Sequence, residues 1–110
     1  MNEPRESVWK KFRALLPVWR ERYLAERNPR IAAVLRDAKK TETERFWEAE
    51  KMIEQDARIL ARCLNDIRRS RLWERLAEMR AARMIRREDL EEFSPELQKQ
   101  VFSDDVPRQG

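Results

Sequence analysis

The chain of 110 residues contains one glycine, and this glycine is the last residue, Gly110. Phosphate-cradling loops, dinucleotide-binding turns and tight β-hairpins need positive φ angles or a close backbone approach, which glycine supplies. The sequence therefore argues against P-loop, Rossmann and hairpin-rich folds. Arginine, glutamate, leucine and alanine dominate the remaining positions and β-branched residues are sparse. This composition is typical of an all-α protein.

The chain has no histidine, and Cys63 is its only cysteine. Imidazole bases, histidine metal ligands, zinc sites and internal disulfides are thereby excluded. The pairs Glu44 with Glu48 and Glu88 with Asp89 could ligate a cation or act as acid and base, but carboxylate di-iron bundles also use histidines. Glu44 and Glu48 fit the capped first turn and exposed face of the long helix better than a metal site. We expect no catalytic residue, no metal or cofactor and no small-molecule substrate. Cys63 is expected to be a small buried hydrophobe, with a reactive thiol as the alternative.

The longest stretch without a charged residue covers only positions 14–19. A membrane-spanning helix needs about 20 apolar residues, so we expect no contact with a membrane. A single cysteine agrees with a reducing compartment, and we expect the protein to be cytoplasmic.

The spacing of apolar residues predicts an all-α bundle of about four to five helices, in one domain over residues 1–102 with a flexible tail over 103–110. Pro17 falls inside the first helix, which is expected to kink there. Asn28 and Pro29 suit an N-cap and a first helical position, and therefore predict the start of a second helix. The first helix, from about 5 to 27, is indicated by a mainly aromatic stripe, most of it expected in the core: Trp9, Phe12, Leu16, Trp19 and Tyr23.

A long central helix is predicted over about residues 42–69. Thr41 and Glu44 have the spacing of a capping box at its start, although the helix could also join the preceding one without interruption. After Ile67 the apolar register slips, which indicates either a helix break at Ser70 or a stutter in a continuing helix. The seam expected to face the core comprises Phe46, Ile53, Ala57, Leu60, Leu64 and Ile67.

Near the C-terminus, Ser94 and Pro95 again combine an N-cap with a proline at the first helical position. They predict a short final helix that carries Leu97 and Val101. Leu90 and Phe93 are expected to anchor the turn before it.

Charge is distributed unevenly along the chain. Residues 88–110 hold seven acidic and two basic side chains, a net charge of −5, so residues 1–87 carry +9 of the total of +4. The densest basic segment covers residues 68–87. It can be a solvated surface paired with the acidic end, a protein interface, or a phosphate-binding surface. In the last case the nucleic-acid contacts would be Arg68, Arg69, Arg71, Arg75, Arg80, Arg83, Arg86 and Arg87.

Trp47 and Trp73 each lie one residue beside an apolar seam, at the margin of the expected core. They either widen the core or form a place where a partner docks. We interpret the chain as a non-catalytic protein that acts by protein–protein interaction, as a regulator, adaptor or assembly subunit, with another protein or its own copy as partner and a homodimer expected. The alternative is a nucleic-acid-binding module whose arginines are modulated by the acidic end. The predicted interface residues are Trp47, Leu72, Trp73, Arg75, Leu76 and Arg83.

Overall fold

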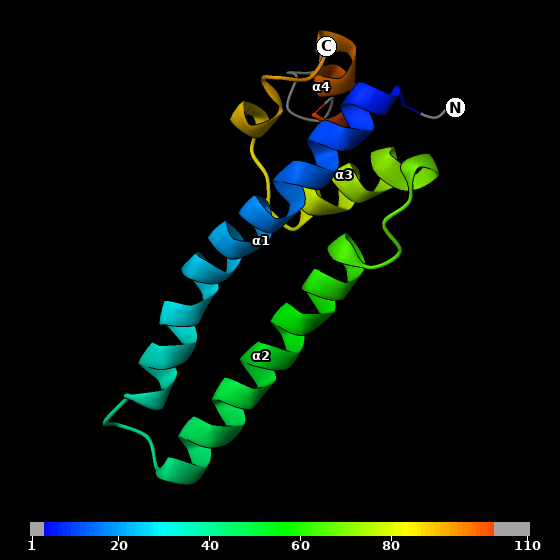
Figure 1. The fold of residues 1–110 in the computed structure, drawn as a ribbon. Helices are drawn as coiled ribbons and strands as arrows, with labels where there is room; N and C mark the ends of the chain where they lie inside the picture. Colours follow the sequence, from blue (N-terminus) through cyan, green and yellow to red (C-terminus); the bar gives the residue numbers. More distant parts are fainter. Residues whose placement is uncertain (1–3, 103–110) are drawn as a thin grey trace, which may run out of the picture.

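The computed structural model describes residues 4–102, which form four α-helices, two short 3₁₀ turns and no strand (Figure 1). The predicted all-α architecture is confirmed, whereas the predicted tail at 103–110 lies outside the described residues. In chain order the elements are α1 (Glu6–Leu35), α2 (Glu42–Leu64), η1 (Arg69–Arg71), α3 (Leu72–Ala81), η2 (Arg87–Leu90) and α4 (Pro95–Val101).

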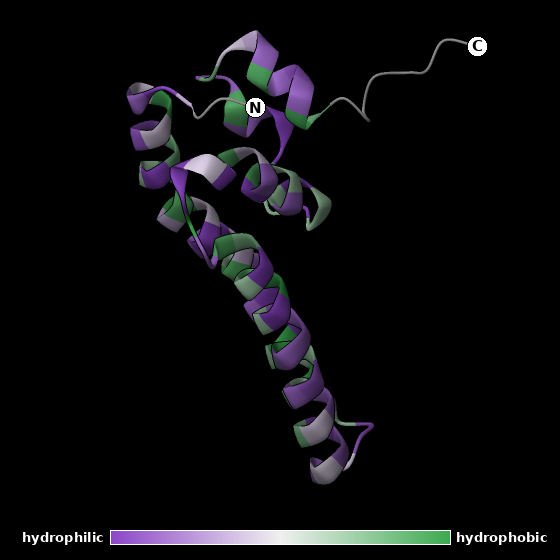
Figure 2. Ribbon diagram, turned by 90° about the vertical axis from the view of Figure 1, so that its right-hand side faces the viewer, coloured by the Kyte–Doolittle hydropathy of each residue, from purple (hydrophilic) through white to green (hydrophobic). Residues whose placement is uncertain are grey.

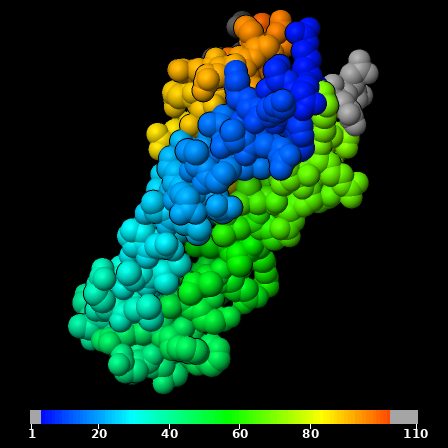
Figure 3. Space-filling model, viewed as in Figure 1, coloured from blue at the N-terminus to red at the C-terminus, as the bar shows by residue number. Residues whose placement is uncertain are grey.

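Helices α1 and α2 lie side by side as a long antiparallel hairpin, and the shorter elements gather at one end of it (Figures 1 and 3). We call residues 24–60 the arm, and the remaining described residues the head. The molecule is elongated, with principal extents of 52 × 37 × 20 Å. In the head α2 contacts α3 and α3 contacts α4, whereas the arm consists of α1 and α2 alone.

Helix α1 runs without interruption through Pro17 and Pro29. The expected continuity across Pro17 is therefore confirmed, and the expected start of a new helix at Pro29 is wrong. Each proline removes one backbone hydrogen bond to the carbonyl four residues earlier. Those carbonyls belong to Arg13 and Ala25, which are exposed, so water can satisfy them and the helix persists.

Helix α2 begins at the predicted capping box. Thr41 Oγ1 accepts a hydrogen bond from Glu44 N at 3.1 Å, and Glu44 Oε1 accepts one from Thr41 N at 2.8 Å. The helix ends at Leu64 and not near residue 69, so the predicted C-terminal boundary is wrong. Asp66 adopts a left-handed backbone with φ of 56°, which a helix cannot continue through. The break therefore precedes Ser70, which lies in η1.

The core lies almost entirely in the head. Trp19 packs edge-to-face on Phe12 with ring centroids 6.2 Å apart, and Trp9 is half-buried and stacks on the other side of Phe12 at 5.9 Å. Leu90 and Phe93 are buried as predicted, and Ser94 caps α4 through Leu97 N at 3.2 Å. The other fully buried side chains of the head include Cys63, Leu72, Leu76, Met79, Met84 and Leu97.

A polar clamp joins α1 to the C-terminal part of the head. Arg22 donates to both carboxylate oxygens of Asp89, at 2.7 and 2.6 Å, and to the carbonyl of Met84 at 2.9 Å. Asp89 also accepts a bond from the backbone N–H of Arg86 at 2.7 Å. These bonds fix the segment between α3 and α4 against the middle of α1.

Candidate functional site

The arm carries large apolar side chains that no third helix covers. Leu35, Phe46, Trp47 and Ile53 are 50%, 58%, 60% and 52% exposed. Trp47 meets Phe46 edge-on, with ring centroids 4.9 Å apart. Hydrophobic segments recur along the arm among hydrophilic ones, although the arm stands clear of the other elements (Figure 2). Exposed apolar clusters of this kind mark interaction surfaces in soluble proteins.

The predicted seam of α2 is only partly in the core, which corrects the sequence interpretation. The residues of α2 buried against α1 are Ala49, Asp56 and Cys63, seven residues apart. Phe46 and Ile53 lie three residues earlier, about 60° around the helix, and therefore look out from the flank of the hairpin. Two packed helices bury one narrow stripe each, and the broader apolar stripe of α2 remains partly uncovered.

The exposed flank is hollowed into a groove between the two helices. Two adjoining hollows of about 430 and 510 Å³ share Leu35 and Ile53 as common walls. We use "groove" for both hollows together. Its other lining residues are Leu24, Asn28, Ile31 and Ala32 of α1 and Phe46, Ala49, Glu50, Glu54, Asp56, Ala57 and Leu60 of α2.

One ion pair lies between the helices beside the groove. Arg27 Nε donates to Asp56 Oδ1 at 3.0 Å, and the Asp56 side chain is 5% exposed. The second carboxylate oxygen, Oδ2, is buried and has no hydrogen-bond partner among the described residues. Such an atom costs about 1–3 kcal/mol in lost hydration. The hairpin therefore carries an incompletely satisfied polar group beside the apolar residues of the groove.

The predicted interface residues do not form one surface. Leu72 and Leu76 are 0% exposed and belong to the core of the head, which corrects their assignment as surface residues. Trp73 is half-buried, and its indole N–H is buried without a partner among the described residues. Trp47 alone is a large exposed side chain of the arm; it touches Phe46 but does not line the groove. Sequence reasoning missed Leu35, Phe46 and Ile53 as surface residues.

A signal for the exposed flank was present in the sequence. Phe46 and Trp47 are adjacent, and neighbouring positions on a helix point about 100° apart. Both large rings therefore cannot face the same packing partner, so at least one of them had to lie at a margin.

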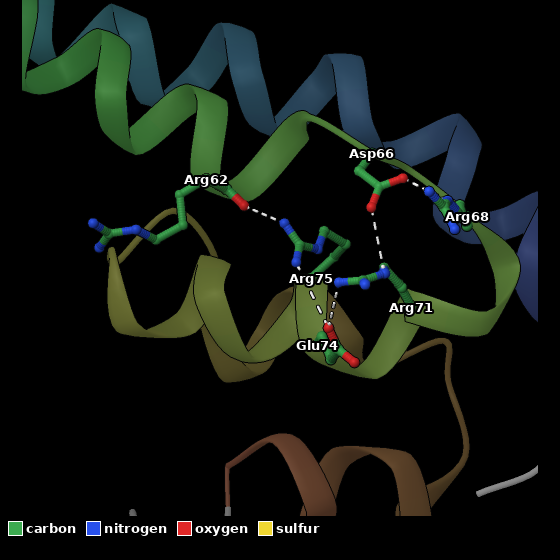
Figure 4. A network of polar contacts seen from close by, with 6 residues as sticks. All are labelled: Arg62, Asp66, Arg68, Arg71, Glu74 and Arg75. Atoms are coloured by element: carbon green, nitrogen blue, oxygen red, sulfur yellow. Dashed lines mark hydrogen bonds and ion pairs between the residues drawn. The ribbon is translucent and has the colours of Figure 1, made fainter.

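The first four arginines of the basic run make contacts within the head, and Figure 4 shows those of Arg68, Arg71 and Arg75. Asp66 accepts from Arg68 at 2.5 Å and pairs with Arg71 at 3.3 Å, while Arg71 also reaches Glu74 at 3.0 Å. Arg75 donates to the carbonyl of Arg62 and approaches Glu74. Arg69, outside this network, donates to the carbonyl of Pro4 at 2.7 Å and pairs with Glu6. These contacts stabilise the turn between α2 and α3.

The remaining four arginines surround the end of α3. Arg80 and Arg87 lie over the ring of Phe102, at 5.6 and 5.4 Å from its centroid. Arg83 and Arg86 line a polar hollow of about 600 Å³ with Arg80 and Glu26. The eight arginines are therefore divided among separate sets of contacts and do not form one continuous stripe.

Arg83 occupies the position after α3 that glycine usually takes. Its φ is 60°, and the N–H of Met84 bonds back to the carbonyl of Met79 at 2.8 Å. This is the hydrogen-bond pattern of a Schellman motif, in which the left-handed residue costs least when it is glycine. The Arg83 side chain is exposed and makes no hydrogen bond or ion pair within residues 4–102.

The described residues offer little reactive or metal-binding chemistry. Burial raises the pKa of the Cys63 thiol to about 11, so the thiolate that reacts is disfavoured at neutral pH. Within residues 4–102 there is no group of three acidic or cysteine side chains placed to hold a metal ion. None of the helices in this range has the length and apolarity needed to cross a membrane.

Comparison with known proteins gives no relative. No protein-family model matches the sequence, no curated protein matches it, and no solved structure matches the fold.

Proposed function

We propose that this chain is a non-catalytic cytoplasmic protein that acts by protein–protein interaction, as a regulator, adaptor or assembly subunit, and that the groove of the arm is its binding surface. The observation that carries the proposal is the exposed apolar flank formed by Leu35, Phe46 and Ile53, which line the groove and are each at least half exposed. These side chains belong to two packed helices that hold them in a fixed arrangement, so a partner helix meets a preformed surface.

The apolar area that the groove exposes is large enough to drive binding. Three large side chains of about 150–250 Å², each half exposed or more, leave roughly 300 Å² of apolar surface in water. Burial contributes about 25 cal/mol per Å², so covering this surface supplies on the order of 8 kcal/mol before the costs of association.

Native mass spectrometry of the protein purified from its host tests this proposal. Ile53→Glu places a charge in the groove, whereas Val18→Glu changes an aliphatic residue of similar exposure, 56% against 52%, that does not line it. We expect a protein complex in the wild type and in Val18→Glu that is lost in Ile53→Glu, and that re-forms from the purified components. The proposal would be contradicted if all three chains carried the same bound protein, or if none of them carried one.

Nucleic acid is a second candidate partner, favoured by the hollow that Arg80, Arg83 and Arg86 line with a single carboxylate, Glu26. Binding through phosphate contacts weakens steeply as salt rises. Arg83→Glu should then abolish low-salt binding of duplex or single-stranded probes, whereas Arg58→Glu on the arm should not. Absence of binding by the wild type at low salt would remove this candidate.

A further inference from the structure

We infer that the groove binds a second copy of this chain in an antiparallel orientation, so that two arms form a four-helix bundle with a head at each end. The inference rests on the proposed function and names its partner. Helical hairpins commonly complete a core by packing face to face, because each supplies two of the four helices.

The exposed area fits a two-fold contact between arms. A stable interface buries about 800 Å² on each partner. Leu35, Phe46 and Ile53 contribute roughly 300 Å² of this from their exposed fractions of 50%, 58% and 52%, taking about 150–250 Å² for a large side chain. The half-buried groove residues, with the polar rim along both helices, supply the remainder. The groove is long enough to contact the arm of a second copy, because it extends from Leu24 to Leu35 on α1 and from Phe46 to Leu60 on α2.

The charges favour contact between the arms and separation of the heads. Residues 24–60 hold eight basic and eight acidic side chains, so the arm has no net charge and does not repel a second arm. The head, residues 4–23 and 61–102, holds sixteen basic and ten acidic side chains, a net charge of +6. An antiparallel bundle puts the two basic heads at opposite ends, whereas a parallel bundle would bring them side by side.

Helix α2 itself is polarised along its length. Positions 42–54 hold five acidic and two basic side chains, whereas positions 55–64 hold one acidic and two basic side chains. Antiparallel packing of α2 on its copy therefore places the acidic half of one helix along the basic half of the other. Like-charged halves would meet if two α2 helices packed in parallel, which is unfavourable.

The apolar positions also repeat symmetrically about Ile53. When Ile53 lies on the two-fold axis, Phe46 is seven residues to one side and faces the level of Leu60, seven residues to the other. Both residues line the groove. The large exposed ring of each copy thus meets a half-buried leucine of the other, which is the self-complementarity that a two-fold contact requires.

Size-exclusion chromatography with light scattering on the purified full-length chain tests the partner. We expect a mass of twice the 13.4 kDa chain for the wild type and for Val18→Glu. Ile53→Glu should raise the dimer dissociation constant by on the order of 100-fold, because the two-fold axis brings two buried carboxylates together. Circular dichroism distinguishes loss of the dimer from loss of the fold, because Ile53→Glu must retain the helical content of Val18→Glu. A monomeric wild type, or a dimer unaffected by Ile53→Glu, overturns the inference.

Distance measurement between spin labels tests the orientation. A label at Glu42→Cys, with the buried Cys63 replaced by alanine, lies eleven residues from Ile53. At 1.5 Å per residue the two labels are about 33 Å apart along an antiparallel bundle, and only about 10–20 Å apart across a parallel one. A short distance overturns the antiparallel arrangement.

Failure of this inference is distinguishable from failure of the proposed function. A monomeric pure protein that forms a complex with a different protein in its host, lost in Ile53→Glu, removes the second copy and keeps the groove as a binding surface. If the pure protein is monomeric and also forms no complex in its host that Ile53→Glu disrupts, both proposals are removed.

Discussion

The clamp between Arg22 and Asp89 predicts a specific loss of stability and a specific pH dependence. Asp89 receives two hydrogen bonds from the guanidinium of Arg22 and one from the backbone N–H of Arg86. Asp89→Asn keeps an oxygen that can accept the backbone bond but removes the negative charge, whereas Asp89→Ala removes both. Comparison of the two substitutions separates the ion pair from the backbone cap.

The magnitude follows from the burial of the pair. The side chains of Arg22 and Asp89 are 33% and 14% exposed, between a surface pair and a buried one. Breaking an exposed pair costs about 0–1 kcal/mol and breaking a buried one about 3–5 kcal/mol, so we expect Asp89→Asn to cost about 2 kcal/mol. Loss of the capping bond to Arg86 adds about 1 kcal/mol in Asp89→Ala. Glu91→Gln, at an exposed position of the same segment, should change stability by less than about 0.5 kcal/mol.

Hydrogen bonds from Arg22 hold the pKa of the Asp89 carboxyl below its ordinary value, although burial opposes them. A carboxyl with a lowered pKa in the folded state stabilises the fold fully above its unfolded-state pKa of about 3.9. The stabilisation disappears as the pH falls below that value and through the lower folded-state pKa. The wild-type advantage over Asp89→Asn should therefore be constant from pH 5 to 7 and decline in stronger acid.

Urea unfolding followed by circular dichroism measures these differences, with every variant at one protein concentration because self-association adds to stability. The reasoning is refuted if Asp89→Asn and the wild type unfold at the same urea concentration, or if Asp89→Ala and Asp89→Asn are equally stable. An advantage that grows on acidification would contradict the assigned sign of the pKa change.

Three further predictions concern single residues. Arg83→Gly should stabilise the protein by about 0.5–1 kcal/mol, because a left-handed φ costs an L-residue more than glycine loses in backbone entropy. The control Ala77→Gly, inside α3, should destabilise the protein by about 1 kcal/mol. Equal effects of the two substitutions on urea unfolding would contradict this prediction. Thr41→Ala should cost about 1 kcal/mol through loss of the capping box, and an unchanged unfolding midpoint would argue against it. Cys63, with a pKa of about 11 and no exposed surface, should resist alkylation at pH 8 until urea unfolds the chain; rapid modification of the native protein would contradict its burial.

Local sequence signals predicted the beginnings of helices well. The capping box at Thr41 and the Ser94–Pro95 start are both present, because each depends on residues three positions apart. The signal at Pro29 failed because exposed carbonyls tolerate a missing donor, so the same proline fits a helix start or a helix interior. Helix α2 ends where Asn65 becomes extended and Asp66 after it becomes left-handed, which no apolar pattern reveals.

The candidate site was harder to predict, because it depends on how many helices surround α2. Phe46 and Ile53 form a regular apolar seam, and such a seam is buried in a bundle but partly exposed in a two-helix hairpin. Leu72 and Met79 have the same seven-residue spacing and are buried, since other elements of the head cover them. Helical periodicity identifies the apolar face but not the number of partners that cover it.

Sedimentation equilibrium of the purified wild type, Val18→Glu and Ile53→Glu over a dilution series tests whether a second copy of the chain covers the groove of the arm in solution. We expect dimers for the first two chains and a helical monomer for Ile53→Glu. A wild-type chain that stays at 13.4 kDa at every concentration would show that no second copy covers the groove.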